Sequence, residues 1–429
     1  MRFRRLILPL VHLRDALNWM ARSPLRAFVI IFALSFAIRG ALLFSGLLPL
    51  HPDPFHETGH VAVSLARSGR FADPYKIPTG LTAHPTPIYA GILGLIYRVF
   101  GVTVTAAYVR GLLAIVSFSA LYAMQPWLAL RLGAGAAAGV IGGLAGALIP
   151  QQGFLEIIGG SDNLFPGIAL GLLTLGFLSR WTGGRDSTFD SLLLGIGCGV
   201  ALHLSPPLLL VILGWMMFEM VWRKDRRKWI SLACLALGAI VACTPWAWRN
   251  YKAFHEFLFV RSNFGLELRL ANHDGADADI DVTVAREPDF RHPSVNLEEA
   301  RKVRDLGEAE YMRQSKNEAL NWIRQHPRRF LFLTVVRIVY FWCGPLQRLP
   351  WNGAAITAVT IVGLLGLRRI LPALAAPQRA TLLIPLATFP LVYYVVSFVG
   401  HYRAPIEWML LLLAGVELWH WIKPKEIES

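Results

Sequence analysis

Long apolar runs separated by short clusters of Lys and Arg are the feature that most restricts how this chain can fold. Residues 26–48 form the first run, interrupted once by Arg39, and about 20 apolar residues suffice to cross a hydrocarbon core of about 30 Å. Apolar side chains make up 55% of the 429 residues, charged ones only 16%, and the mean hydropathy is +0.47. These values exclude a soluble globular domain and predict an all-α polytopic membrane protein.

The basic clusters predict the orientation, because Lys and Arg gather in the cytoplasmic loops of membrane proteins. Six arginines among residues 2–26, together with Lys423 and Lys425, place both termini in the cytoplasm. This topology also accounts for much of the net charge of +14, so no nucleic-acid partner is predicted. The apolar runs predict ten crossings, at residues 26–48, 107–130, 133–150, 163–180, 188–204, 206–222, 229–247, 352–367, 378–399 and 404–422.

Two further apolar runs, Pro87–Phe100 and Phe330–Cys343, are short of a full crossing. Each carries an Arg, Arg98 or Arg337, together with Tyr or Trp, a mixture typical of the membrane–water interface. We expect both to be interfacial helices. The alternative, that one or both cross the membrane, stays open and would move some loops to the opposite face.

This topology divides the chain into three parts. Residues 1–247 form an N-terminal membrane module with a first external loop at 49–106, residues 248–351 form a long external region, and residues 352–429 form the C-terminal transmembrane helices. Residues 151–162 are also external. Within the long region, residues 296–325 have a helical pattern, with Asn296 as cap, Glu299 completing a capping box and Pro327 ending the helix. We expect this helix to lie on the membrane surface, without an independent domain core.

Two pairs of acids on neighbouring external loops are the first candidates for chemistry. Asp53 and Glu57 are four residues apart, and therefore on one face if this segment is helical. Glu156 and Asp162 form a possible second pair. Acids near a bilayer cost free energy unless they are paired or solvated, so the four could bind a divalent cation or activate a hydroxyl group. Asp162 could equally cap the helix that follows it.

External basic residues and the loop from Pro78 to Pro87 are the second group of candidates. Arg offers a planar fork that matches phosphate oxygens, so a lipid phosphate is one natural partner; anchoring to anionic lipid is the other. The loop is rich in Pro, Gly and Thr, and we expect it to shape a substrate site beside the acids. The external basic residues close to predicted membrane boundaries are Lys76, Arg249, Lys252, Arg261, Arg269 and Arg403.

Five sequence blocks, in order along most of the chain, resemble the GT-C class of integral-membrane glycosyltransferases. The resemblance is to the bacterial branch related to protein O-mannosyltransferases and to the lipid A aminoarabinose transferase. The blocks are the acid-bearing first loop with SLARSGRFADPY, then PTGLTAHPTPIYAGILGLIYRVFG, TPWAWRNYKAFHEFLFVRSNFGLEL, LGEAEYMRQSKNEALNWIRQHPRRF and YYVVSFVGHYRAPIEWMLLL.

The resemblance implies a hexosyl- or pentosyltransferase of the bacterial inner membrane, which moves a sugar from a polyprenyl-phosphate donor to an acceptor on the periplasmic face. It implies an essential acid in the first external loop, for which Glu57 is the best match and Asp53 the second. Many members have an adjacent Asp-Glu pair where this chain has His56-Glu57. This difference leaves three roles open for Glu57: it could act as a base, orient the acceptor or help to hold a divalent metal. The candidates for binding substrate or phosphate are Lys76, His84, Arg249, Arg261, Tyr402 and Arg403.

The partners implied are membrane lipids, the lipid-linked sugar donor, and an acceptor that is a protein, lipid A or a cell-envelope glycan. A polysaccharide ligase or polymerase using lipid-pyrophosphate donors is the closest alternative. A transporter or flippase of lipid-linked sugars is the other. It would need ionisable residues along a pathway and paired repeats, whereas Arg39 and Glu417 are isolated and no repeat is evident.

Overall fold

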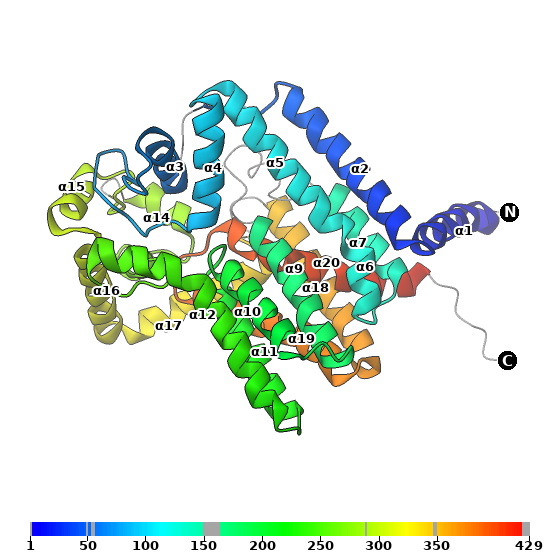
Figure 1. Cartoon of the computed structure of the whole chain (residues 1–429). Coiled ribbons are helices and arrows are strands. Elements are labelled where there is room, and N and C mark those ends of the chain that lie inside the picture. The colour runs from blue at the N-terminus through cyan, green and yellow to red at the C-terminus, as the bar shows by residue number, and fades with distance from the viewer. Residues whose placement is uncertain are drawn as a thin grey trace.

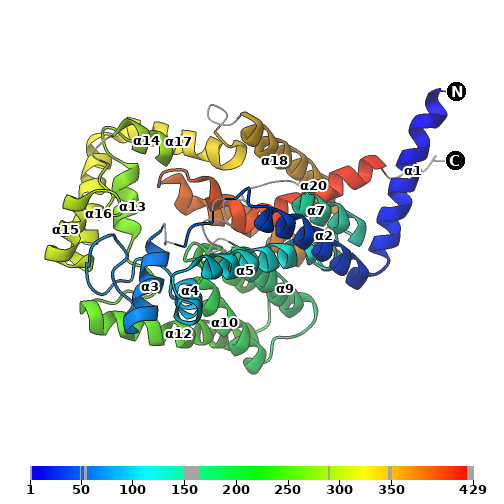
Figure 2. The ribbon, with the colours of Figure 1, turned by 90° about the horizontal axis from the view of Figure 1, so that it is seen from above.

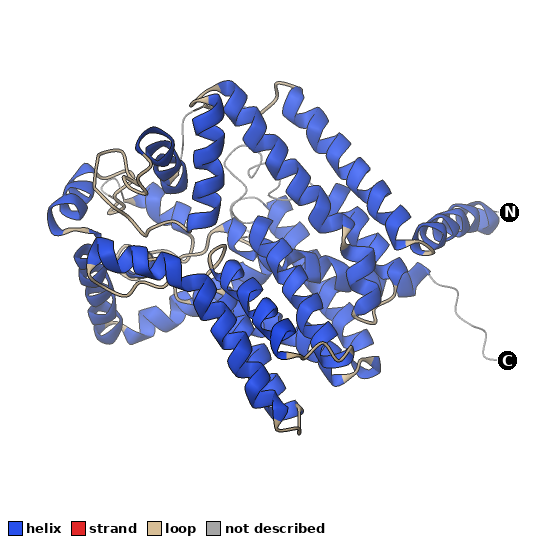
Figure 3. Ribbon diagram, viewed as in Figure 1, coloured by secondary structure: helices blue, strands red, loops and turns tan. Residues whose placement is uncertain are grey.

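The computed structural model describes residues 2–48, 50–52, 56–148, 164–287, 290–345 and 350–422, and its regular structure in these residues is helical (Figure 3). Extended pairing there is limited to two isolated bridges, Ala72 with Leu81 and Asp279 with Phe398. The predicted all-α polytopic membrane fold is confirmed. Helices suit a chain in lipid because they satisfy their backbone hydrogen bonds internally.

The described helices are given in chain order. They are α1 (Arg2–Ala21), α2 (Pro24–Phe44), α3 (Glu57–Ser68), α4 (Pro87–Phe100), α5 (Val104–Ala123), α6 (Gln125–Arg131), α7 (Ala136–Leu148), α9 (Leu164–Thr182), α10 (Thr188–Leu202), α11 (Leu208–Trp222), α12 (Arg227–Phe254), α13 (Phe264–Ala271), α14 (Ile280–Arg286), α15 (Leu297–Leu306), α16 (Glu308–Gln325), α17 (Pro327–Cys343), α18 (Pro350–Ile370), η1 (Leu371–Ala373), α19 (Ala376–Thr388), η2 (Phe389–Tyr394), η3 (Gly400–Arg403) and α20 (Ala404–Ile422).

Helices occupy most of the described part of each predicted crossing. The stretch predicted at 378–399 differs, because α19 gives way to the 3₁₀ helix η2, where Pro390 has no N–H to continue the α-helical ladder. By length and composition, four stretches of the described residues could each cross a membrane, and the number of ten crossings stays a prediction. These stretches are Pro24–Phe44, Val104–Arg131, Arg227–Phe254 and Gly353–Ala373.

Helix α20 is the buried centre of the bundle. Every residue from Pro405 to Gly415 is buried, and α20 packs against α7, α9 and α18. At Gly415 a Cβ atom would collide with the carbonyl oxygen of Ala138 in α7, and at Gly366 of α18 it would collide with that of Leu413. Glycine therefore lets these helix backbones approach closely, as is typical of packing between helices in lipid.

The polar segments gather on one side of the bundle in what we call the lobe, defined as residues 56–86 and 255–326. Both views place α3, α14, α15 and α16 on this side, with α1 on the opposite side (Figures 1 and 2). The two runs predicted to be interfacial are helical. Pro87–Phe100 is α4, and Phe330–Cys343 lies within α17.

The helix predicted over 296–325 is two helices, separated at Gly307, whose φ of +81° belongs to the left-handed region. Asn296 caps α15 as predicted, since its side chain accepts hydrogen bonds from two backbone N–H groups of the first turn at 3.0 and 3.2 Å. The predicted capping box is wrong in its second half. The Glu299 carboxylate accepts a hydrogen bond from Arg269 at 2.7 Å instead of reaching back to the cap.

The lobe has a small apolar cluster to which both of its parts contribute, and the division of the chain into three parts stays a prediction. Tyr75 of the first loop is a member, so the cluster joins the first loop to the long region and neither part forms a core alone. Its buried members are Tyr75, Leu266, Leu270, Phe290, Val303, Tyr311 and Met312.

Candidate functional site

Glu57 is the first residue of α3, at the end of the helix that carries partial positive charge. The buried side chains of Val61 and Ala62 fix the helix, which packs against α4. Gly69, with a φ of +69°, ends α3 and turns the chain into the loop 70–86. This packing fixes Glu57 at the start of the helix, within the lobe.

Two residues from the segment before α15 lie next to the carboxylate of Glu57. Ser294 Oγ donates a hydrogen bond to Glu57 Oε1, and His292 Nε2 lies 3.7 Å from the same oxygen. Burial raises the pKa of Glu57, but the positive charge that His292 and His84 carry when protonated in acid, together with the hydrogen bond from Ser294, outweighs burial and lowers the pKa to about 2. Glu57 is therefore ionised at neutral pH while its side chain stays 22% exposed.

The ring of His292 is oriented by the backbone. Its Nδ1 atom accepts a hydrogen bond from the N–H of Ser294 at 3.0 Å, so the proton of the neutral ring is on Nε2. Nε2, which carries this proton, is the ring atom nearest the Glu57 carboxylate. At 3.7 Å the two atoms do not form a direct hydrogen bond, so among the described side chains Ser294 alone donates to this carboxylate.

A second acid, Glu267 of α13, is coupled electrostatically to Glu57. Asn263 Nδ2 donates a hydrogen bond to Glu267 Oε1 at 3.1 Å. Burial raises the pKa of Glu267, and the charge of Glu57 raises it further, against the charges of His292 and Arg261. The two carboxyl groups thus have pKa values moved in opposite directions, a pattern found where one acid stays ionised and the other exchanges a proton.

His84 is buried beside Tyr75. His84 is 3% exposed, and its Nδ1 atom lies 3.1 Å from the Tyr75 hydroxyl oxygen. The Tyr75 ring is edge-on to both His84 and His292, with ring centroids 5.6 and 6.3 Å apart. Burial lowers the pKa of His84 to about 3, despite the opposing charge of Glu57. His84 is therefore neutral at pH 7.

This buried neutral imidazole predicts a loss of stability in mild acid. Between pH 6.5 and 3 the unfolded chain binds a proton at His84 that the folded chain does not, so stability falls as the pH falls. The loss is about 2 kcal/mol between pH 6.5 and 5. Thermal unfolding in detergent from pH 7 to 5 should show a steeper decline for the wild type than for His84→Asn. Parallel curves for the two proteins would contradict the prediction.

The Pro/Gly/Thr-rich loop is held against the site by a buried carboxylate. Glu308, at the start of α16, accepts hydrogen bonds from the Thr82 hydroxyl, from the Ala83 N–H at 2.7 Å and from Ser262 Oγ at 2.6 Å. Burial raises the pKa of Glu308 although these three bonds oppose the shift. Glu308 therefore fixes the loop to the start of α16, and the loop's shaping of a substrate stays a prediction.

Arg249, predicted to bind phosphate, is engaged by the same loop. Its two terminal nitrogens donate to the carbonyl oxygens of Thr82 and Phe71, each at 2.6 Å. Arg249→Lys should therefore lower the free energy of unfolding by about 1–3 kcal/mol, because one ammonium group cannot serve both buried carbonyls. Thermal unfolding in detergent measures this, with Lys252→Arg, an exposed change one turn further along α12, as control. Unchanged stability in Arg249→Lys would show that the two bonds are dispensable.

Three other predicted binding residues lie near Glu57. Arg261 Nε donates to the His84 carbonyl oxygen at 2.7 Å. Tyr402 has its pKa raised by burial and then by the charges of Glu267 and Glu57. Lys76 is exposed. His60 lies one turn after Glu57, and its pKa is lowered by burial and further by the charge of Lys76.

Arg403 lies elsewhere. It is 3% exposed, forms a buried ion pair with Glu407, and donates to the Trp342 carbonyl and the Thr360 hydroxyl at 2.9 and 2.7 Å. Its guanidinium group thus joins α17, α18 and α20. The other predicted acids, Asp53, Glu156 and Asp162, lie outside the described residues.

Sequence reasoning missed three residues of the site. His292 and Ser294 lie in a short polar segment without periodicity, and no local pattern marks them. Glu267 lies in one of the blocks that resemble GT-C proteins, so an acid in that block was the available signal. The described residues contain no group of three or more His, Cys, Asp or Glu side chains placed to hold a metal ion, and the divalent metal stays a prediction.

Comparisons with known proteins give structural neighbours only. No protein-family model matches the chain, and no curated protein sequence matches it. The oligosaccharyltransferase AglB of Archaeoglobus fulgidus, in complex with an inhibitory peptide and a dolichol-phosphate, matches 92% of this chain with a TM-score of 0.54 and 15% identity. Its apo form matches 91% of this chain with the same TM-score and 17% identity.

The chain spans about half the length of these AglB structures, of which 50% is covered. ArnT from Cupriavidus metallidurans, bound to undecaprenyl phosphate, is also similar, at 14% identity over 91% of this chain and 78% of that one, but its TM-score of 0.36 is too low to support an argument. The AglB likeness concerns fold alone. In fold, the chain is of the GT-C type predicted from its sequence.

Proposed function

We propose that this protein is a membrane glycosyltransferase that moves a sugar from a polyprenyl-phosphate donor to an acceptor hydroxyl on the periplasmic face of a bacterial inner membrane. The observation that carries the proposal is the ionised, partly exposed carboxylate of Glu57. It lies at a helix end in the lobe of a GT-C fold, coupled to a second acid, Glu267, whose pKa is raised. AglB, of the same fold, is described as an oligosaccharyltransferase in complex with a dolichol-phosphate.

The two acids have different roles in this proposal. Glu57 accepts a hydrogen bond from the acceptor hydroxyl and orients it, since a group with a pKa of about 2 is a weak base. Glu267, with its raised pKa, is better matched to take the proton. The acceptor oxygen bonds to the sugar C1, the bond from C1 to the phosphate oxygen breaks, and polyprenyl phosphate leaves with that electron pair.

Cationic groups beside the acids would stabilise the departing phosphate. Arg261 uses its Nε atom on the His84 carbonyl, and no acceptor for its two terminal amino groups is found among the described residues. The ammonium group of Lys76 is exposed on the same loop system. Arg–phosphate hydrogen bonds are charge-assisted and often bidentate, so these groups would bind the phosphate more strongly as its charge develops.

The test is transfer of radiolabelled sugars in membranes from cells that express the chain, beside membranes from cells with an empty vector. The donors are sugars on polyprenyl monophosphate and, in a parallel arm, on polyprenyl pyrophosphate. Proteins, lipid A and cell-envelope glycans are the acceptors. Labelled product that depends on the chain and on the monophosphate donor is expected. Product from the pyrophosphate donor alone would favour a ligase or polymerase, and donor translocation without transfer would favour a flippase.

A further inference from the structure

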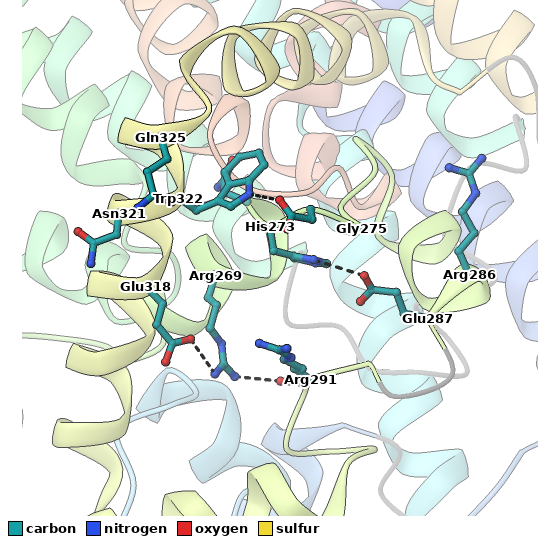
Figure 4. Close-up of a pocket in the computed structure, with 12 residues that line it drawn as sticks. Arg269, His273, Gly275, Arg286, Glu287, Arg291, Glu318, Asn321, Trp322 and Gln325 are labelled. Carbon is teal, nitrogen blue, oxygen red and sulfur yellow. Dashed lines mark hydrogen bonds and ion pairs between the residues drawn. The ribbon is translucent and has the colours of Figure 1, made fainter.

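The lobe contains a second site, an open polar pocket of about 780 Å³ (Figure 4). We propose that this pocket binds an uncharged saccharide unit, which makes the acceptor a glycan. The lining of the pocket is the evidence for saccharide binding, whereas the role of the pocket as the acceptor site rests on the proposed function. The remaining lining residues are Asn272, Asp274, Gly275 and those discussed below.

One wall is a face of α16. Glu318, Asn321, Trp322 and Gln325 follow the spacing i, i+3, i+4, i+7 and therefore share one side of the helix. Figure 4 shows their side chains in a row along α16. Two amides, a carboxylate and an indole together supply hydrogen-bond donors, acceptors and an apolar ring surface. Sugar rings present the same combination of hydroxyl groups and C–H faces.

The opposite wall comes from the last residue of α14 and from the segments on either side of this helix. Arg286, Glu287 and Arg291 line it, and His273 Nδ1 lies 3.3 Å from Glu287 Oε1. The Arg291 side chain has no hydrogen-bond partner among the described residues, and it is exposed. This wall adds charged donors and acceptors opposite the amides of α16.

The balance of charge favours a neutral ligand. Three guanidinium groups and three carboxylates line the pocket, and Arg269 Nη1 lies 3.5 Å from Glu318 Oε2 across it. A phosphate would meet as many anions as cations. A polyhydroxylated ligand can instead donate to the carboxylates and accept from the guanidinium groups.

Arg269 is a fixed donor at the base of the pocket. It is 7% exposed and is held by Glu299, by the Tyr311 hydroxyl at 2.6 Å and by the Arg291 carbonyl at 3.0 Å. Its buried Nε atom has no hydrogen-bond partner. These contacts hold the guanidinium plane in one orientation, with its Nη1 atom toward Glu318 on the α16 wall.

The pocket and the Glu57 site share a wall. Arg291 lines the pocket, and the next residue, His292, lies 3.7 Å from the Glu57 carboxylate. Helix α13 likewise contributes Glu267 to one site and Arg269 to the other. The two sites are therefore neighbours in the lobe, and in our proposal a glycan held in the pocket extends its terminal hydroxyl group toward Glu57.

The experiment measures saccharide binding to the full chain in lipid nanodiscs by saturation-transfer NMR. The probes are the methyl glycosides of glucose, galactose, mannose and N-acetylglucosamine, with inorganic phosphate as competitor. Asn321→Ala/Gln325→Ala removes two exposed amides of the pocket and should weaken binding of the preferred glycoside about tenfold. Asn317→Ala removes an exposed amide of α16 that does not line the pocket, and should bind as the wild type does.

Three results would overturn the proposal. They are absence of binding by every glycoside, equal binding by the double variant and the wild type, and complete competition by phosphate. Failure of the proposed function has a separate readout. If the protein binds glycosides but transfers no sugar, the pocket is still a saccharide-binding site, and only its role as the acceptor site is removed.

Discussion

Replacing Glu57 by glutamine is expected to lower donor-dependent sugar transfer by about 10²–10³-fold, the range found when one preorganised electrostatic group is removed from a reaction site. Glutamine keeps the shape of the side chain, and its carbonyl oxygen still accepts the hydrogen bond from Ser294. It carries no charge, so it neither orients the acceptor hydroxyl as strongly nor stabilises the positive charge that develops on the sugar. The measurement is the initial rate of transfer at equal protein level in membranes.

Glu298→Gln is the matched control, because Glu298 is an exposed acid of α15 in the same lobe. It should transfer at the wild-type rate, and Glu57→Gln should keep the wild-type unfolding temperature within a few degrees.

Glu267→Gln separates the two acids. If Glu267 takes the proton, its removal abolishes the acid limb of the pH–rate profile. Full activity in Glu57→Gln would remove Glu57 from the site.

The largest expected effect on stability is that of Glu219→Ala, a loss of about 3–5 kcal/mol. The Glu219 side chain is 0% exposed and its carboxylate lies 2.8 Å from Arg180 Nε, whose side chain is 1% exposed. It also accepts a hydrogen bond from Trp181 at 3.0 Å. Alanine leaves the Arg180 guanidinium buried without its counter-ion. Heating the detergent-purified protein and measuring the fraction that stays monodisperse gives the change.

Two further variants make this test specific. Glu310→Ala breaks an exposed ion pair with Arg313 and should cost about 0–1 kcal/mol. The double variant Arg180→Leu/Glu219→Leu removes both buried charges and should recover most of the loss, because the cost of the single change is an uncompensated charge. A single variant within 1 kcal/mol of the wild type would show that water or another group neutralises Arg180.

The fold was predictable from sequence because its signals are local. The run from Pro87 to Phe100 coincides with α4, since proline at the first turn starts a helix and Gly101, at a φ of +68°, ends it. Gly307 was missed as a helix break. Its neighbours continue the helical pattern, and only the requirement for a φ of +81° distinguishes the position.

The site was predictable only in part, because its contacts join distant segments. Glu57 was predicted from its place beside the first membrane segment and from the resemblance to GT-C proteins, and its role stays a prediction, whereas its partner Ser294 is 237 residues away and carries no local signal. Arg249 shows the opposite problem. A guanidinium group also binds carbonyl oxygens, and only the structure shows that the terminal nitrogens of Arg249 donate hydrogen bonds to the carbonyl oxygens of Thr82 and Phe71.

The buried position of α20 has a consequence for biogenesis. Among the described helices it is the last to leave the ribosome, yet it fills the space between α7, α9 and α18. Some neighbouring helices pack closely against α20 through glycines such as Gly366. Until α20 inserts, these glycines face lipid or another helix. The N-terminal helices therefore cannot reach their final packing during synthesis, and the bundle is completed only after translation of α20.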